Sequence, residues 1–182
     1  LSGCLKGELP EKMLKGDFEG AKKTAIMYSQ IFNNRYYLEI QNHGIPEEAA
    51  NIANMKKLSS ELGLPLVCTN DAHYARQNHW EAHDIHICLG TGKERSDQNR
   101  LRYATPEFYF KSEDQMFKLF KEFPGAIENS RKIADSINFE LPIGESHLPK
   151  FPIPESALTS DPNKYLQALT QAGAESHYGE IS

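Results

Sequence analysis

The sequence predicts an α/β fold whose parallel strands carry polar residues at their C-terminal ends. Two observations predict it. Helical apolar patterns alternate with short β-favouring runs, in the order helix, strand, helix, strand. The second of these strands, 64–69, also runs directly into the polar residues Asn70, Asp71 and His73. In parallel α/β folds, functional sites lie at such strand ends.

Local signals place the first four elements. Asp17 is a helix cap before a pattern with an apolar face, and 36–41 is an aromatic-rich strand. Pro46 begins the next helix, which Gly63 ends, and the strand 64–69 follows at once. Because the connections are short, this strand–helix–strand unit implies parallel pairing and a right-handed crossover.

The rest of the chain reads as helical, apart from two irregular stretches. A helix is expected over 78–89, followed by a polar loop over 94–103. Ser112 begins a capping box and a helix, Pro124-Gly125 breaks it, and 126–137 forms a second helix, so that the two make a hairpin. Four prolines make 141–154 an extended arm or linker. A last helix follows Ser160-Asp161-Pro162 and ends near Gly173.

Composition excludes several classes of protein. The chain is 39% hydrophobic and 25% charged, which is typical of a soluble globular protein. A net charge of −5 argues against autonomous nucleic-acid binding, and no apolar run could span a bilayer. The three cysteines are widely spaced and form no C-x-x-C pair, which suits a reducing cytoplasm. We therefore expect a cytoplasmic protein that has no membrane partner.

Asp71 and His73 are the principal candidates for chemistry. If the strand stays extended past Thr69, their side chains point to the same side, where a carboxylate and an imidazole could hold a divalent metal. The alternative is a turn in which Asn70 or Asp71 caps the following helix. The loop around Cys4 is expected on the same rim, and the alternative for Cys4 is a small buried residue beside a glycine.

Other polar groups are interpreted more simply. His79, His83 and His86 lie in the 78–89 segment, and we interpret them as packing or hydrogen-bonding residues, with metal ligation as the alternative. No H-E-x-x-H motif is present. Arginines at 95, 100 and 102 could approach phosphates, but a solvated loop is the commoner arrangement.

Several short motifs stand out when they are taken in combination. They are LSGCLKGE (1–8), YLEIQ (37–41), VCTNDAHY (67–74), AHD (82–84), TPEFYFK (105–111), Asn129-Ser130, the proline-rich arm and the final helix (165–178). Together they resemble the bacterial replicative DNA polymerase III alpha subunit family, specifically the second half of its polymerase-and-histidinol-phosphatase (PHP) domain and the segments that follow, up to the entry into the palm.

The resemblance implies a fold and a ligand set. The fold is part of a distorted (β/α)7 PHP-type barrel over 1–110, with a helical hairpin packed on it over 111–139. A proline-rich linker over 140–160 and the incomplete start of a palm domain over 161–182 follow. The resemblance also implies that Cys4, Asp71 and His73 bind divalent metal, either zinc or manganese, in a site that retains activity.

The chain opens without Met, and we expect a piece of a longer protein. The remaining PHP ligands would lie before Leu1, and the polymerase carboxylates with their Mg²⁺ would lie after Ser182. The fragment alone would then be inactive and could be metal-free. The implied function of the full-length protein is DNA-directed DNA polymerisation (nucleotidyl transfer) in DNA replication, with DNA and other holoenzyme subunits as partners.

Three functions remain open for the PHP part. The first is a metal-dependent 3′–5′ exonuclease or phosphoesterase. The second is a non-catalytic scaffold that stabilises the polymerase and docks a proofreading exonuclease subunit. The third is a free-standing metal phosphoesterase, which the proline-rich arm and the palm-like final helix disfavour.

Overall fold

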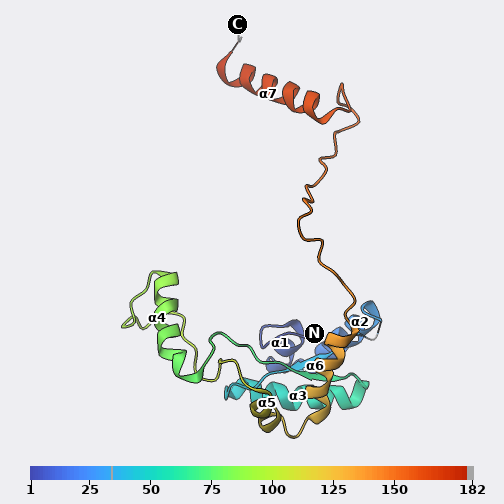
Figure 1. Ribbon diagram of the computed structural model, residues 1–182. Coiled ribbons are helices and arrows are strands. Elements are labelled where there is room, and N and C mark those ends of the chain that lie inside the picture. Colours follow the sequence, from blue (N-terminus) through green and yellow to red (C-terminus); the bar gives the residue numbers. More distant parts are fainter. Residues whose placement is uncertain (34, 180–182) are drawn as a thin grey trace. The chain divides into compact units, whose positions relative to one another are not determined.

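The computed structural model describes residues 1–33 and 35–179. It divides into two units, Leu1–Asn138 and Phe139–Ser182 (Figure 1). The elements of the first unit are α1 (Glu8–Leu14), α2 (Phe18–Ile31), β1 (Leu38–Ile40), α3 (Pro46–Leu62), β2 (Leu66–Cys68), the 3-10 turn η1 (Gln77–His79), α4 (Trp80–Thr91), α5 (Glu113–Leu119) and α6 (Pro124–Ser136).

Strands β1 and β2 pair in parallel, as the strand–helix–strand order predicts. The register places Leu38 opposite Leu66 and Ile40 opposite Cys68, and α3 is the crossover between the strands. Each strand is shorter than its apolar run. On the N-terminal side of β1, the Tyr37 carbonyl accepts from the Ser2 amide at 3.0 Å, so this part of the segment pairs with the chain's first residues. The α/β class is confirmed for the coarse fold, while closure into a barrel stays a prediction.

The core lies where the helices meet this small sheet. Helix α6 packs on β2, α3 packs on β1, and α1 packs on both α2 and α3. The Asn129 side chain of α6 also donates to the Leu66 carbonyl at 2.8 Å. Apolar residues of the strands and of α1, α2, α3, α5 and α6, with their flanking residues, are fully or nearly fully buried: Leu9, Met13, Ala21, Ala25, Leu38, Ile40, Met55, Leu58, Phe120 and Ala126.

The helix boundaries that depend on local signals agree with the sequence prediction. The Asp17 carboxylate accepts from the Gly20 amide at 2.9 Å and caps α2. Gly63 ends α3 in the left-handed conformation, with φ of 67°. Ser112 and Gln115 form both hydrogen bonds of the capping box at α5. These signals act within one helical turn, so the sequence alone is enough to place them.

Two helix boundaries and one additional helix differ from the prediction. Pro124 does not break the chain between two helices but begins α6, because proline is well suited to the first turn, where its missing N–H costs no hydrogen bond. Gly173 lies inside the last helix, which continues to Tyr178. Helix α1 was not predicted, because its seven residues carry only a short apolar pattern.

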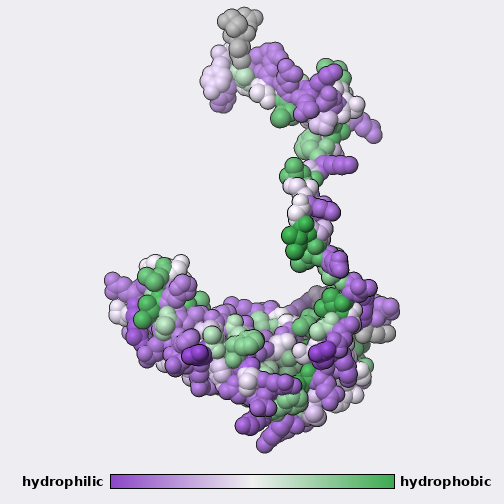
Figure 2. All heavy atoms as spheres, in the orientation of Figure 1, coloured by the Kyte–Doolittle hydropathy of each residue, from purple (hydrophilic) through white to green (hydrophobic). Residues whose placement is uncertain are grey.

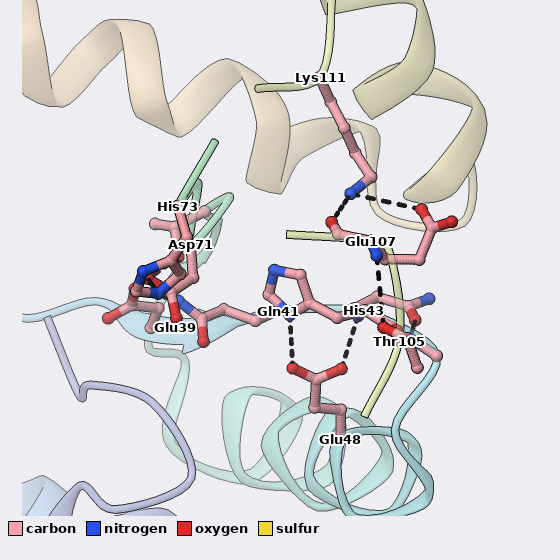
Figure 3. Close-up of polar contacts among 12 residues, drawn as sticks. Glu39, Gln41, His43, Glu48, Asp71, His73, Thr105, Glu107 and Lys111 are labelled. Atoms are coloured by element: carbon pink, nitrogen blue, oxygen red, sulfur yellow. Dashed lines mark hydrogen bonds and ion pairs between the residues drawn. The ribbon is translucent and has the colours of Figure 1, made fainter. Parts of the chain in front are cut away.

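A buried, hydrogen-bonded pair of His43 and Glu48 lies at the start of α3. The His43 side chain is 1% exposed and its Nδ1 lies 2.7 Å from Oε1 of Glu48. The second oxygen of Glu48 accepts from the His43 amide at 2.5 Å. Burial opposes ionisation of Glu48, but these two bonds from His43 outweigh it and lower the pKa of the carboxyl. Figure 3 shows Glu48 directed at His43.

The second unit consists of an extended segment and the helix α7 (Pro162–Tyr178). Asp161 caps this helix by accepting from the Asn163 amide. Apolar side chains stand exposed along the extended segment, as Figure 2 shows: Phe139, Leu141, Ile143, Leu148, Phe151 and Leu158. Within the described part of the chain, no helix is both long and apolar enough to cross a membrane.

The His43–Glu48 pair generates a first prediction. Replacing Glu48 with Gln removes the charge that both His43 bonds use, and should lower the protection free energy of the α3 amides by about 1–3 kcal/mol. The measurement is hydrogen–deuterium exchange of the full-length gene product at neutral pH. Glu47→Gln, the exposed neighbour, is the matched control and should change little.

Repeating this comparison of wild type and Glu48→Gln at acid pH tests whether the stabilisation depends on the ionised Glu48 carboxylate. Since the folded-state pKa of Glu48 lies below its ordinary 4.5, the stabilisation is present above that pH and is lost as the pH falls through the lowered value. The difference between wild type and Glu48→Gln should therefore shrink in acid. A difference that stayed constant down to the lowest pH reached would contradict this assignment.

Candidate functional site

Asp71 and His73 converge in the loop that follows β2. The strand ends at Cys68, and the Ala72 amide then donates to the Asn70 carbonyl at 2.8 Å, which marks a tight turn. The extended backbone therefore does not continue past Cys68, but the Asp71 and His73 side chains still lie in contact. Nε2 of His73 lies 3.2 Å from Oδ1 of Asp71. The turn therefore brings the Asp71 and His73 side chains together, as an extended strand was expected to do.

The spacing of these two donor atoms fits a shared ion. Two donors at about 2.0 to 2.1 Å from a tetrahedral ion lie roughly 3.4 Å apart, and two adjacent donors of an octahedral ion lie roughly 2.9 Å apart. The observed 3.2 Å between Asp71 and His73 falls between these values. Both side chains are partly exposed, at 46% and 33%, so a ligand could reach them from solvent. Zinc and manganese both accept this pair of donors.

The segment 107–110 lies beside the Asp71–His73 loop and is hydrogen-bonded to it. The His73 amide donates to the Phe108 carbonyl at 2.8 Å, and the Phe110 amide donates to the Tyr74 carbonyl at 2.9 Å. The Asn70 side chain donates to the Tyr109 carbonyl at 2.9 Å. Residues 107–110 thus run beside 70–74 and fix its backbone. The sequence identified 108–110 only as an apolar segment, because this pairing joins residues more than thirty positions apart.

Lys111 anchors the supporting segment. Its side chain is 4% exposed, and the ammonium donates to the Glu107 carbonyl and lies 3.5 Å from the Glu107 carboxylate (Figure 3). The ammonium also lies 4.3 Å from the centroid of the Tyr109 ring. Burial lowers the pKa of Lys111, against the opposing influence of Glu107.

An aromatic cluster surrounds the His73 ring. The Tyr103 hydroxyl lies 3.1 Å from Nε2 and 3.2 Å from Nδ1 of His73, and the His83 ring centroid lies 5.8 Å from that of His73. Phe108 meets His73 edge-on and stacks on the buried His43 ring at 4.1 Å. Burial raises the pKa of Tyr103, and the Asp71 carboxylate raises it further. Burial lowers the pKa of His83, with a further contribution from His73.

The helix α4 contributes one of its histidines to this cluster. His83 packs on His73, Tyr103 and Tyr74, in agreement with the packing role expected for the histidines of this segment. The neighbouring Asp84 binds both terminal nitrogens of Arg100, at 2.6 and 2.7 Å. The bond from Arg100 lowers the pKa of Asp84. Arg100 is thus occupied by an ion pair rather than free for phosphate.

Cys4 lies in a tight turn before α1. Gly3 has φ of 81°, and the Gly7 amide donates to the Cys4 carbonyl at 2.7 Å. A Cβ on Gly7 would lie 2.4 Å from the Ser2 carbonyl oxygen, so the turn needs glycine there. Cys4 is exposed, whereas Cys68 and Cys88 are buried.

The turn does not carry Cys4 into contact with the other two candidates. Over residues 1–33 and 35–179, no three His, Cys, Asp or Glu side chains gather closely enough to hold one ion. The structure therefore brings Asp71 and His73 together and leaves Cys4 apart from them. The donor pair fits a metal in part, and the three-ligand set stays a prediction.

Glu39 joins the two loops and was missed by the sequence analysis. Its side chain lies on β1 and accepts from the Gly3 amide at 3.1 Å and from the Thr69 hydroxyl at 2.5 Å. Figure 3 shows Glu39 in the same region as the Asp71 and His73 side chains. A carboxylate within the otherwise β-favouring run 36–41 was the available signal, because such a charge is rarely buried without partners.

Comparison with known proteins finds relatives that match the whole length of this chain. No protein-family model matches the chain. A DNA polymerase III subunit alpha of Treponema pallidum is 39% identical over 100% of the chain, and that of Borreliella burgdorferi is 37% identical over the same share. The Thermus aquaticus protein of the same name is 33% identical over 98% of the chain.

The match covers a small part of each relative. The chain spans 16% of the Treponema and Borreliella proteins and 15% of the Thermus protein. The similarity therefore extends along the whole chain and is confined to one segment of much longer proteins. By this similarity, the chain belongs to the bacterial DNA polymerase III alpha subunit family.

Proposed function

We propose that this chain forms part of a PHP-type domain in a replicative DNA polymerase alpha subunit. In this proposal Asp71 and His73, together with Cys4, hold a divalent metal for hydrolysis of phosphodiester bonds from a 3′ end. The convergence of Asp71 and His73 after a parallel strand, at a spacing that one ion could bridge, is the observation that carries the proposal.

The bound ion would supply a metal-activated water and would polarise a phosphoryl oxygen. The chain's own residues would orient its ligands. The Tyr103 hydroxyl contacts both ring nitrogens of His73 and so restrains the imidazole. The backbone bond from His73 to Phe108 fixes the main chain from which the ring projects. The partial exposure of both side chains leaves room for a substrate phosphate.

The activities of the full-length protein belong to the same proposal. The relatives are DNA polymerase III alpha subunits, so the gene product would be a cytoplasmic DNA-directed DNA polymerase that acts in replication. Its polymerase carboxylates and their Mg²⁺ would lie outside this chain, and DNA and other holoenzyme subunits would be its partners. The 182 residues alone would lack both activities.

A scaffold role is the second candidate. It is favoured by the position of Cys4, which joins no three-donor group with Asp71 and His73 over the described residues. In that case the domain would stabilise the polymerase and dock a proofreading exonuclease subunit. The two candidates differ in whether the gene product binds metal at Asp71 and whether it degrades DNA.

Metal binding is the first test of the proposal. In the full-length gene product, Asp71→Asn should weaken Mn²⁺ or Zn²⁺ binding by more than the roughly 10- to 100-fold that loss of an outer-shell contact costs. The measurement is competition with a chromophoric chelator. Asp135→Asn, which changes an exposed aspartate on α6, is the matched control. Equal affinities in the two variants would remove Asp71 from the ligand set.

DNA degradation separates the two candidates. On a duplex with a recessed 3′ end and no nucleotides, the wild-type gene product should shorten the primer when Mn²⁺ or Zn²⁺ is present. Asp71→Asn should reduce this to the level seen with chelator, while primer extension by the same preparation continues. If the wild type binds metal but leaves the primer intact, the scaffold role is supported instead.

A further inference from the structure

Arg100 ties the loop that follows α4 back onto that helix. Its side chain is 2% exposed, and its two terminal nitrogens bind the two carboxylate oxygens of Asp84 at 2.6 and 2.7 Å. Arg100 also holds its own loop, because Nε donates to the Arg95 carbonyl at 3.3 Å and a terminal nitrogen donates to the Leu101 carbonyl at 3.2 Å. A guanidinium and a carboxylate are planar, so two parallel bonds between them fix direction as well as distance.

The loop 93–102 is also hydrogen-bonded within itself. Arg102 donates to the Asp97 carbonyl at 2.8 Å and to the Arg95 carbonyl at 3.2 Å. The Glu94 amide donates to the Asp97 carboxylate at 3.0 Å. These bonds hold the loop in one arrangement, which the Asp84–Arg100 pair then joins to α4.

Asp84 makes the closest side-chain attachment between this loop and α4. The other ion pairs that join them within the described residues are longer, at 3.7 Å from Arg95 to Asp84 and 3.9 Å from Arg95 to Glu81. Helix α4 itself packs chiefly on η1, and Figure 1 shows it projecting from the helices around the sheet. Loss of the Asp84 carboxylate would leave a nearly buried guanidinium without its partner, and hydration of that charge would draw the loop away from α4.

Tyr103 comes directly after this loop and contacts the candidate site. Its hydroxyl lies 3.1 Å from Nε2 and 3.2 Å from Nδ1 of His73, and its ring centroid lies 4.6 Å from those of His73 and Phe108. Tyr103 and Asp84 also line one small cavity, which leaves about 10 Å³ for the centre of a water molecule. Since Tyr103 is three residues after Arg100, a shift of the loop would move the hydroxyl off the imidazole.

We propose that Asp84 is a positioning residue for His73. Through Arg100 it holds the loop on α4, and the loop places the Tyr103 hydroxyl against the His73 imidazole. The orientation of that ring decides which nitrogen faces Asp71, whose Oδ1 lies 3.2 Å from Nε2. The inference rests on the proposed function for the role of His73 as a ligand, but the contacts themselves involve no ion. Asp84 touches neither substrate nor metal in this scheme.

Carbethoxylation of His73 is the test. Diethyl pyrocarbonate transfers an ethoxycarbonyl group to an accessible, unprotonated imidazole nitrogen, and mass spectrometry of the His73 peptide measures the rate. The full-length gene product is first treated with chelator, so that no ion shields the ring. Asp84→Asn offers Arg100 one acceptor oxygen and no charge, and should raise the rate about 2- to 10-fold, the factor expected for losing one hydrogen bond of ordinary strength. Tyr103→Phe, which removes only the hydroxyl, should raise it by a similar factor.

Two controls separate positioning from a loss of fold. Glu81→Gln changes an exposed carboxylate of the same helix and should leave the rate unchanged. The peptide that contains His43, whose side chain is 1% exposed, reports on folding in the same digest and should stay unlabelled in every variant. Faster labelling of His73 beside a protected His43 shows that the contact on the ring has moved in a folded domain, which an ion pair with a purely structural role would not produce.

Arg100→Gln breaks the pair from its other side and keeps the test decisive if Asp84→Asn unfolds the domain. It should raise the labelling of His73 as Asp84→Asn does, and combining the two changes should add nothing further, because both break one contact. Wild-type labelling in both variants, beside a rise in Tyr103→Phe, would overturn the role of Asp84. Wild-type labelling in Tyr103→Phe would overturn the contact through which Asp84 acts. Because the protein is free of ions here, unchanged metal affinity in Asp71→Asn would remove the proposed metal site without altering this result.

Discussion

The parallel pairing of β1 and β2 is the constraint on which the rest of the first unit depends. Because α3 returns the chain so that both strands point the same way, their C-terminal ends open on one edge. Asp71 and His73 follow β2 on that edge, and the Glu39 carboxylate reaches from β1 to the Thr69 hydroxyl and to the Cys4 turn. An antiparallel pair would place the polar loops at opposite ends of the sheet.

A series of contacts links Glu48 in α3 to His73 at this edge of the sheet. Glu48 holds the buried His43 ring, which stacks on Phe108, and Phe108 in turn binds the backbone of His73. The charge of Glu48 therefore lies at the base of a series that ends at a candidate ligand. Burial of each intermediate ring gives the series its stiffness, since packed interiors have few alternative arrangements.

Sequence reasoning located the features that depend on neighbours along the chain. The Asp17 cap, the Gly63 stop and the parallel strand order follow from residues within a turn or a short loop, and the structure confirms them. It missed the links from Glu39 to Gly3 and Thr69 and the support from Phe108, because those contacts join residues thirty or more positions apart. The convergence of Asp71 and His73 was expected for a different reason, since a turn and not an extended strand brings them together.

Cobalt substitution tests most directly the proposal that Cys4, Asp71 and His73 bind one ion in the full-length protein. Co²⁺ bound by a thiolate gives an intense charge-transfer absorption that carboxylate and imidazole ligands do not give. The full-length gene product loaded with Co²⁺ should show this band, and both Cys4→Ser and Asp71→Asn should weaken it. A band that Cys4→Ser leaves unchanged, or a wild-type protein that binds Co²⁺ without one, would contradict the claim.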